Sequence, residues 1–184
     1  MKKSLLTTFA LLSALAIFPL LSQAQCNVSD NVSQSPKMLL LLGGQEKIFE
    51  NKDLEDGVQM LYARPSLTTL KDDKNRIIFS IEFSYAASGE KPQIVPRQAK
   101  FHFKTDAPEL LLIAEKHETE NMGGFAVERC VFRVLPKDAA LIKDNPIRGL
   151  TLIDNRTGEK VFLPIYASLF QEQFQCLLNK LKYL

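Results

Sequence analysis

The chain has 184 residues, of which 46% are hydrophobic and 24% are charged, and its formal net charge at pH 7 is +2. This length suits one domain with a substantial hydrophobic core. The near balance of charge excludes the strongly basic surface by which proteins bind nucleic acids or anionic membranes.

The first 24 residues are typical of a secretory signal peptide. Lys2 and Lys3 form a basic start, and the sequence from Leu5 to Leu21 is nearly all apolar. The run is about as long as a short membrane span, but Pro19 and the small residues of Ser22-Gln23-Ala24 favour cleavage. We therefore expect residues 1–24 to be removed and the protein to be exported, to the periplasm or outside the cell.

The mature chain would begin at Gln25 and contain no transmembrane span. Gln23 and Gln25 stand where a lipoprotein signal needs a leucine and a small residue, so we expect ordinary cleavage and not lipidation of Cys26. Without the two leader lysines, 21 basic side chains balance 21 acidic ones. Residues 25–37 are polar and predict a flexible arm.

Residues 38–184 predict a single β-rich domain. Short apolar runs alternate there with turn residues, and the clearest run is Arg76–Tyr85, in which every second residue is large and apolar. The predicted strands are Met38–Leu42, Glu46–Glu50, Val58–Arg64 with Leu67–Leu70 as its extension or a new strand, Arg76–Tyr85, Ala99–Lys104, Leu110–Lys116, Phe125–Leu135, Ile147–Ile153 and Lys160–Tyr166.

Three pairs of these strands predict hairpins. Met38–Leu42 and Glu46–Glu50 flank Gly43-Gly44, and Ile147–Ile153 and Lys160–Tyr166 flank a turn in which Gly158 is free to adopt positive φ. The third pair, Leu110–Lys116 and Phe125–Leu135, is joined by a connection that holds His117-Glu118-Thr119-Glu120.

Two helices are expected. Asp138 is a favourable N-cap for a short helix through Ile142. From Ser168 the apolar period changes to 3.6, which predicts an amphipathic helix over residues 169–181 with Ser168 and Gln171 as a capping box. The fold class is therefore all-β, mainly antiparallel: a β-sandwich of about eight or nine strands with a C-terminal amphipathic helix. A small β-barrel is the alternative.

The chain contains three cysteines: Cys26, Cys130 and Cys176. Export permits disulfides, but spacing does not determine connectivity. A Cys130–Cys176 disulfide would attach the last helix to the sheet, although Cys176 faces away from the helix's apolar stripe. Pairing of Cys26 with either of the others, and free thiols, remain open.

Candidate catalytic and metal-binding residues are few. His102 fits an exposed or half-exposed strand position, and His117 to Glu120 fit a solvated turn better than a metal site. The acidic groups at Asp53, Glu55 and Asp56, at Asp72-Asp73, and at Glu118 and Glu120 lie in polar segments that would not raise a carboxyl pKa. The sequence also lacks a G-x-S-x-G motif. We predict no catalytic residue, no metal site and no cofactor.

These observations favour an exported, non-enzymatic β-sandwich that acts as a binding or envelope-associated structural module. Its partner would be a protein, a glycan or a small apolar ligand. One alternative is a lipocalin-like barrel that carries a small apolar ligand in a closed interior. A hydrolase that uses loop residues ranks last. An exposed apolar patch would favour the binding module.

Overall fold

The computed structural model describes residues 29–31, 37–51, 57–88, 94–156, 158–164 and 166–183. The predicted signal peptide, most of the predicted arm, and Asp53, Glu55 and Asp56 lie outside these residues. The described elements, in chain order, are β1 (Ser29–Asn31), β2 (Met38–Leu42), β3 (Glu46–Asn51), β4 (Gln59–Leu70), β5 (Ile78–Ser88), β6 (Gln98–Phe103), β7 (Leu110–Met122), β8 (Phe125–Val134), α1 (Pro136–Asp144), β9 (Ile147–Asp154), β10 (Gly158–Phe162) and α2 (Leu169–Lys182).

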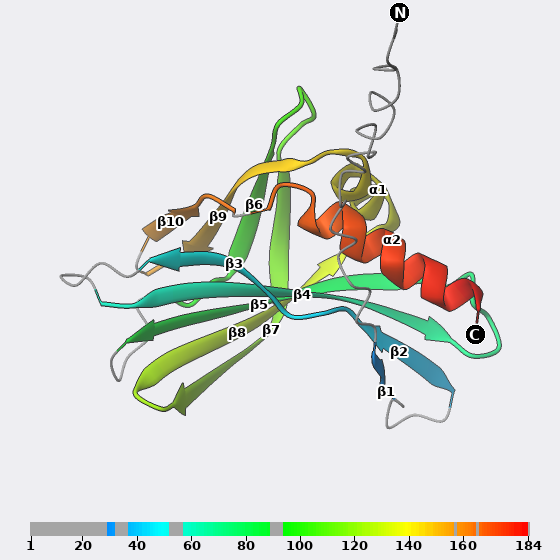
Figure 1. Ribbon diagram of the computed structural model, residues 1–184, viewed down its shortest axis with the longest axis horizontal. Coiled ribbons are helices and arrows are strands. Elements are labelled where there is room, and N and C mark those ends of the chain that lie inside the picture. The colour runs from blue at the N-terminus through cyan, green and yellow to red at the C-terminus, as the bar shows by residue number, and fades with distance from the viewer. Residues whose placement is uncertain are drawn as a thin grey trace, which may run out of the picture.

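The ten strands form one antiparallel sheet (Figure 1). Their order is β1-β2-β4-β5-β8-β7-β6-β9-β10, and β3 also pairs with β4. The predicted antiparallel all-β fold with a C-terminal helix is therefore confirmed. Among the described strands, none joins β10 back to β1 or β3, so the sheet is open and the alternative of a small closed barrel is wrong. Residues 29–31, which fall within the predicted arm, form β1 and pair with β2.

The long strand β7 folds the sheet into two layers. Its first residues, from Leu110 to Ile113, pair with β6, whereas the segment from Ala114 to Met122 pairs with β8. The register shifts between Ala114 and Lys116, which is the kind of bulge that bends a strand. The first layer comprises β1–β5 and β8, and the second comprises β6, β9 and β10.

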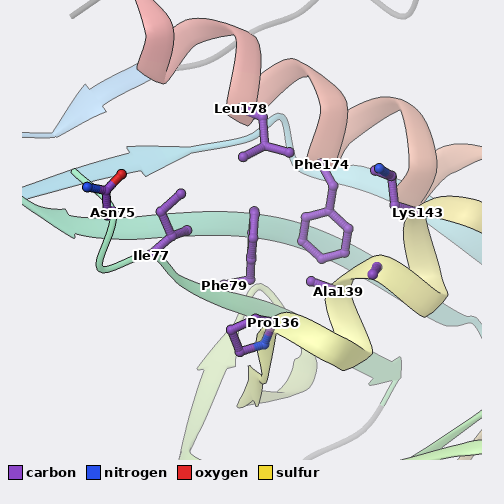
Figure 2. A pocket seen from close by; sticks show the side chains of 9 residues that line it. Asn75, Ile77, Phe79, Pro136, Ala139, Lys143, Phe174 and Leu178 are labelled. Carbon is purple, nitrogen blue, oxygen red and sulfur yellow. The ribbon is translucent and has the colours of Figure 1, made fainter.

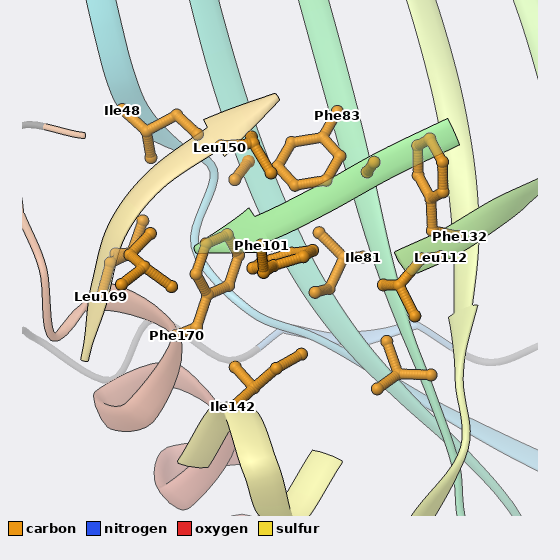
Figure 3. Packing of buried hydrophobic residues seen from close by; sticks show 14 of the residues in the cluster. Ile48, Ile81, Phe83, Phe101, Leu112, Phe132, Ile142, Leu150, Leu169 and Phe170 are labelled. Atoms are coloured by element: carbon orange, nitrogen blue, oxygen red, sulfur yellow. The ribbon is translucent and has the colours of Figure 1, made fainter. Parts of the chain in front are cut away.

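The core lies between the two layers (Figure 3). Phe83 from β5 contacts Phe101 from β6, with ring centroids 6.1 Å apart, and Phe170 from α2 lies 5.6 Å from Phe101. All three rings are buried. Each such pair contributes about 0.5–1.5 kcal/mol beyond its buried area. The apolar face of α2 thus covers one end of a phenylalanine-rich interior.

The predicted hairpin between the segments now seen as β2 and β3 is wrong. Both strands pair with β4, β3 along its first half and β2 along its second. At the junction, the Gly43 N–H donates to the Pro65 carbonyl oxygen at 2.8 Å. A Cβ on Gly43 would lie 2.9 Å from that oxygen, so only glycine allows this approach. Pro65 lies inside β4 because its missing N–H falls where the ladder passes from β3 to β2.

The β7–β8 hairpin is longer than its sequence predicts. The turn is Gly123-Gly124, with φ of 57° and 84°, which suits a tight hairpin turn. His117 to Glu120 are therefore strand residues of β7 and do not form the connection. The predicted pairing of β9 with β10 is confirmed, and Gly158 has a φ of 90°. The predicted bounds of the second strand, Lys160–Tyr166, are wrong, because β10 begins at Gly158 and ends at Phe162.

Both helices are present, but their first turns differ from the prediction. Helix α1 begins with Pro136 after Leu135 as N-cap, so Asp138 lies in its first turn and does not cap it. In α2, Ser168 is the N-cap without a side-chain cap. The predicted capping box is wrong because the Gln171 side-chain amide donates instead to the Lys143 carbonyl oxygen, at 2.9 Å. This bond connects α2 with α1.

Candidate functional site

A groove of about 270 Å³ lies between α1, α2 and the beginning of β5 (Figure 2). Its walls are mainly apolar, and Lys143 and Asn75 lie at its two ends. The apolar lining residues are Ile77, Phe79, Pro136, Ala139, Ala140, Phe174 and Leu178.

The sequence explains why a groove forms here. Phe174 and Leu178 are one helical turn apart on α2, so both project from the same side. Phe79 of β5 meets Phe174 edge to face at 5.0 Å and forms the floor. Opposite them, the middle of α1 presents the methyl groups of Ala139 and Ala140, between Pro136 and Lys143. Small side chains on one helix facing large ones on the other leave the space between them unfilled.

Lys143 gives the groove a positive end. It lies in the last turn of α1, its side chain is 41% exposed, and its Nζ is 3.5 Å from the exposed Asp144 carboxylate. An exposed ion pair of this kind contributes little to folding stability, so Lys143 can leave Asp144 readily. Drug-sized ligands occupy pockets of about 300–1,000 Å³. The groove therefore suits a smaller molecule with an apolar body and one anionic group.

His102 belongs to a hydrogen-bonded chain on the outer side of the second layer. Its Nδ1 is 2.7 Å from Glu109 Oε1 and its Nε2 is 2.9 Å from Thr151 Oγ1. The order acid, imidazole and hydroxyl is that of a hydrolytic triad. The sequence contained no local signal for this grouping because the three residues come from separate strands and a loop.

This grouping does not form a working nucleophile. Thr151 is only 4% exposed, so its hydroxyl is shielded from a substrate. Thr151 also pairs with Lys100 of β6 and with Val161 of β10. The backbone N–H groups around it therefore lie in the plane of the sheet and do not point toward a carbonyl above the hydroxyl, as an oxyanion hole requires. The hydrogen bonds that join Glu109, His102 and Thr151 therefore orient these side chains on the outer side of the second layer.

His117 and its neighbours form ordinary polar pairs. The Arg97 guanidinium lies 3.0 Å from His117 Nδ1, and because arginine only donates, this ring nitrogen accepts. The hydrogen bond and charge of Lys116 hold the pKa of Glu118 below its usual value, so this carboxyl is not a proton donor at neutral pH. The Asn75 backbone N–H donates to the Asp73 carboxylate in a turn.

The predicted Cys130–Cys176 disulfide is wrong. Cys130 is a free, fully buried thiol on β8, whereas Cys176 is disulfide-bonded. Cys130 points into the core, whereas Cys176 lies away from the apolar stripe of α2. The two side chains therefore do not face each other. Burial, with a contribution from Glu128, raises the pKa of Cys130 to about 12. The thiol therefore stays protonated at neutral pH and is a poor nucleophile.

A buried polar cluster occupies the other end of the interior. Glu128 is fully buried; its Oε1 accepts from the Thr119 hydroxyl at 2.6 Å, and its Oε2 has no partner among the described residues. Nearby, Lys160 Nζ donates to the Tyr85 hydroxyl at 3.0 Å and to the Gln59 side chain. Burial raises the pKa of Tyr85 to about 12, so this phenol is neutral at physiological pH.

The outer side of the second layer exposes large aliphatic residues where alternation would place polar ones. Leu111, Ile113, Val161 and Leu163 are between 49% and 71% exposed. We refer to these four residues as the aliphatic face. The sequence signal was the unbroken apolar run at 161–163, in which only Phe162 points inward.

No protein-family model, curated protein or solved structure matches the chain. In the part of the chain that the structure describes, no helix has the length and apolar character needed to cross a membrane. Within the same residues, His, Cys, Asp and Glu side chains nowhere gather in a group of three that could hold a metal ion.

Proposed function

We propose that this protein is an exported, non-enzymatic binding protein that holds a small amphipathic anion, such as a medium-chain carboxylate, in the groove between α1, α2 and β5. The observation that carries the proposal is the combination of a mainly apolar groove with a lysine at one end. The alkyl chain would lie against Phe79 and Phe174, and the carboxylate would pair with Lys143.

Export is supported by the leader-like N-terminus and by the disulfide at Cys176, because disulfides persist in oxidising compartments. A binding role, and not catalysis, is supported by the chemistry of the reactive groups. The Cys130 thiol is protonated, Thr151 is shielded and Glu118 is held as an ion pair.

The test uses the mature protein and three ligands that share one alkyl chain: decanoate, decanol and decyltrimethylammonium. Binding is followed by methyl NMR of Ile77 and Leu178. We expect decanoate to shift both methyl signals and to bind more tightly than decanol. A charge-assisted hydrogen bond of about 1.5–3 kcal/mol corresponds to roughly a tenfold or larger difference in Kd.

Two variants locate the site. Ala140→Trp fills the groove from an exposed position and should abolish binding of all ligands. Lys143→Gln should weaken decanoate to the affinity of decanol without changing decanol. Lys137→Gln, on the exposed side of the same helix, is the matched control and should change neither. The proposal fails if millimolar decanoate leaves the Ile77 and Leu178 methyl signals unmoved, or if Lys137→Gln and Lys143→Gln have equal effects.

A further inference from the structure

We propose that one end of the molecule docks on the surface of an anionic lipid bilayer. This end is formed by the turn between β4 and β5, the residue before β2 and the last turn of α2. We refer to it as the basic end, after its six cationic residues: Lys37, Lys71, Lys74, Arg76, Lys180 and Lys182. The inference goes beyond the groove and does not require the groove to hold a ligand.

The fold brings these cations together from three separate segments. The Lys71 backbone N–H donates to the Lys37 carbonyl oxygen at 2.9 Å, so the start of β2 lies beside the end of β4. Asn75, in the turn that follows, lines the groove together with Leu178 of α2, and Lys182 lies one helical turn beyond Leu178. Figure 1 shows the C-terminal end of α2 beside this turn.

The charges of the basic end do not cancel. Its turn also contains Asp72 and Asp73, so six cations against two carboxylates leave a net charge of +4. Arg76 Nε lies 3.2 Å from the Asp73 carboxylate, whereas the two lysines of the turn pair with no carboxylate among the described residues. On the β7–β8 hairpin, by contrast, Lys116 pairs with Glu118. The balanced charge of the whole chain therefore conceals a local positive surface, which net charge alone does not predict.

Two neighbours of the basic end favour a lipid surface as the source of the anionic groups. Tyr183 follows Lys182 at the end of α2 and is 87% exposed. Tyrosine is enriched where bilayer meets water, because its ring is apolar and its hydroxyl is polar. The apolar groove also ends at Asn75, within the turn that carries the cations (Figure 2). A nucleic acid is equally anionic but offers no alkyl chain to such a groove.

The charge sets the strength of docking. Each Lys or Arg close to an anionic leaflet strengthens binding roughly fivefold. A net charge of +4 therefore predicts a preference of roughly 600-fold for anionic over neutral vesicles at low salt. The attraction should disappear at high salt, where the Debye length shortens to a few ångströms. Docking is thus peripheral and reversible.

A tryptophan reporter tests docking directly. The chain contains no tryptophan, so Tyr183→Trp gives the mature protein a single indole at the basic end. With vesicles of phosphatidylcholine and phosphatidylglycerol at about 20 mM salt, the emission should shift to the blue and the protein should sediment with the vesicles. Neither should occur with phosphatidylcholine alone or at about 500 mM salt. A protein that does not bind the anionic vesicles at low salt overturns the proposal.

Two double variants locate the surface. Lys71→Gln with Lys182→Gln removes two charges from the basic end and should weaken vesicle binding roughly 25-fold. Lys104→Gln with Arg148→Gln removes two charges from the second layer and is the matched control, with little expected change. All four side chains are exposed, so both variants should unfold at the wild-type temperature. Equal losses in the two variants would overturn the assignment to the basic end.

Duplex DNA distinguishes a membrane from another polyanion. DNA should not displace the protein from the anionic vesicles at the same salt concentration, and it should leave the emission of Tyr183→Trp without a blue shift. If DNA binds the basic end as tightly as the vesicles do, the partner is a nucleic acid and the proposal fails.

Discussion

Phe49 on β3 and Phe162 on β10 meet edge to face with their ring centroids 4.9 Å apart, although no backbone pairing joins these two strands. Lys160 of β10 also reaches Gln59 of β4. Side chains therefore bring the two separated edges of the open sheet together. Tyr85 adds a second ring contact to Phe162, at 5.9 Å.

Phe162→Ala should lower the free energy of unfolding by about 3–5 kcal/mol, because it removes a buried ring and leaves a cavity. Urea denaturation measures this change. Val161→Ala is the matched control: the side chain is adjacent but 61% exposed, so its loss should cost less than about 1 kcal/mol. Equal losses in the two variants would show that the ring contact does not hold this edge.

Tyr85 should make stability depend on pH at the alkaline end. Its folded-state pKa is about 12, above the ordinary value of 10.0. Between these values the unfolded chain loses the phenolic proton while the folded chain retains it. Stability from this group is thus complete below pH 10 and falls as pH rises toward 12, by up to about 1.4 kcal/mol per unit.

Urea denaturation at several pH values between 9 and 12 measures this dependence. Tyr85→Phe should flatten the alkaline fall and should remove one phenolate step near pH 12 from the ultraviolet titration. A Tyr85→Phe variant with the same alkaline profile as the wild-type protein would contradict the assignment.

The number of reactive thiols should differ between the native and the unfolded protein. Cys130 is free and buried, and Cys176 is disulfide-bonded, which leaves Cys26 as the only partner within the chain. Cys26 lies outside the described residues. The native protein should show no thiol that reacts with Ellman's reagent at pH 8, because Cys130 is both buried and protonated. Unfolding without a reductant should expose one thiol per chain.

Peptide mapping completes this test. Without reduction, mass spectrometry should find one linked pair of peptides that contain Cys26 and Cys176. Detection of a Cys130 peptide in any disulfide, or rapid modification of Cys130 in the native state, would refute the prediction.

Thr119→Val should destabilise the fold by about 1–3 kcal/mol. The substitution removes the hydroxyl that donates to the buried Glu128 carboxylate at 2.6 Å and leaves that oxygen without a donor. Thr119→Ser retains the hydroxyl and serves as control, with a loss below about 1 kcal/mol. Thermal unfolding at pH 7 compares the two. A Thr119→Val variant as stable as Thr119→Ser would show that this hydrogen bond is dispensable.

Much of the secondary structure could be predicted because its causes are local. Alternation along β5 and the 3.6-residue period of α2 reflect one buried face in each element. The predicted boundaries failed where a distant partner decided them. Pro65 remains within β4 because the ladder is interrupted beside it, and β7 continues past His117 because β8 supplies hydrogen bonds as far as Met122.

The candidate site was beyond prediction for the same reason. Nothing near Ala139 or Ala140 in the sequence indicates that Phe174 and Leu178 will face them, since the spacing between two helices depends on how both pack on the sheet. The Glu109–His102–Thr151 chain likewise needs β6 and β9 to be neighbours. Cys130 is free because β8 lies between β5 and β7 and directs its side chain into the core, which its place in the sequence does not indicate.

By itself, the sequence determined both helices and most of the strands, and the buried side of the long strands, because backbone sterics and side-chain periodicity act over a few residues. The tertiary structure alone decided the strand order, the fold of β7 into two layers, the free state of Cys130, the groove beside Lys143 and the aliphatic face. Each of these depends on contacts between residues far apart in the chain, whose formation is settled only when the whole core packs.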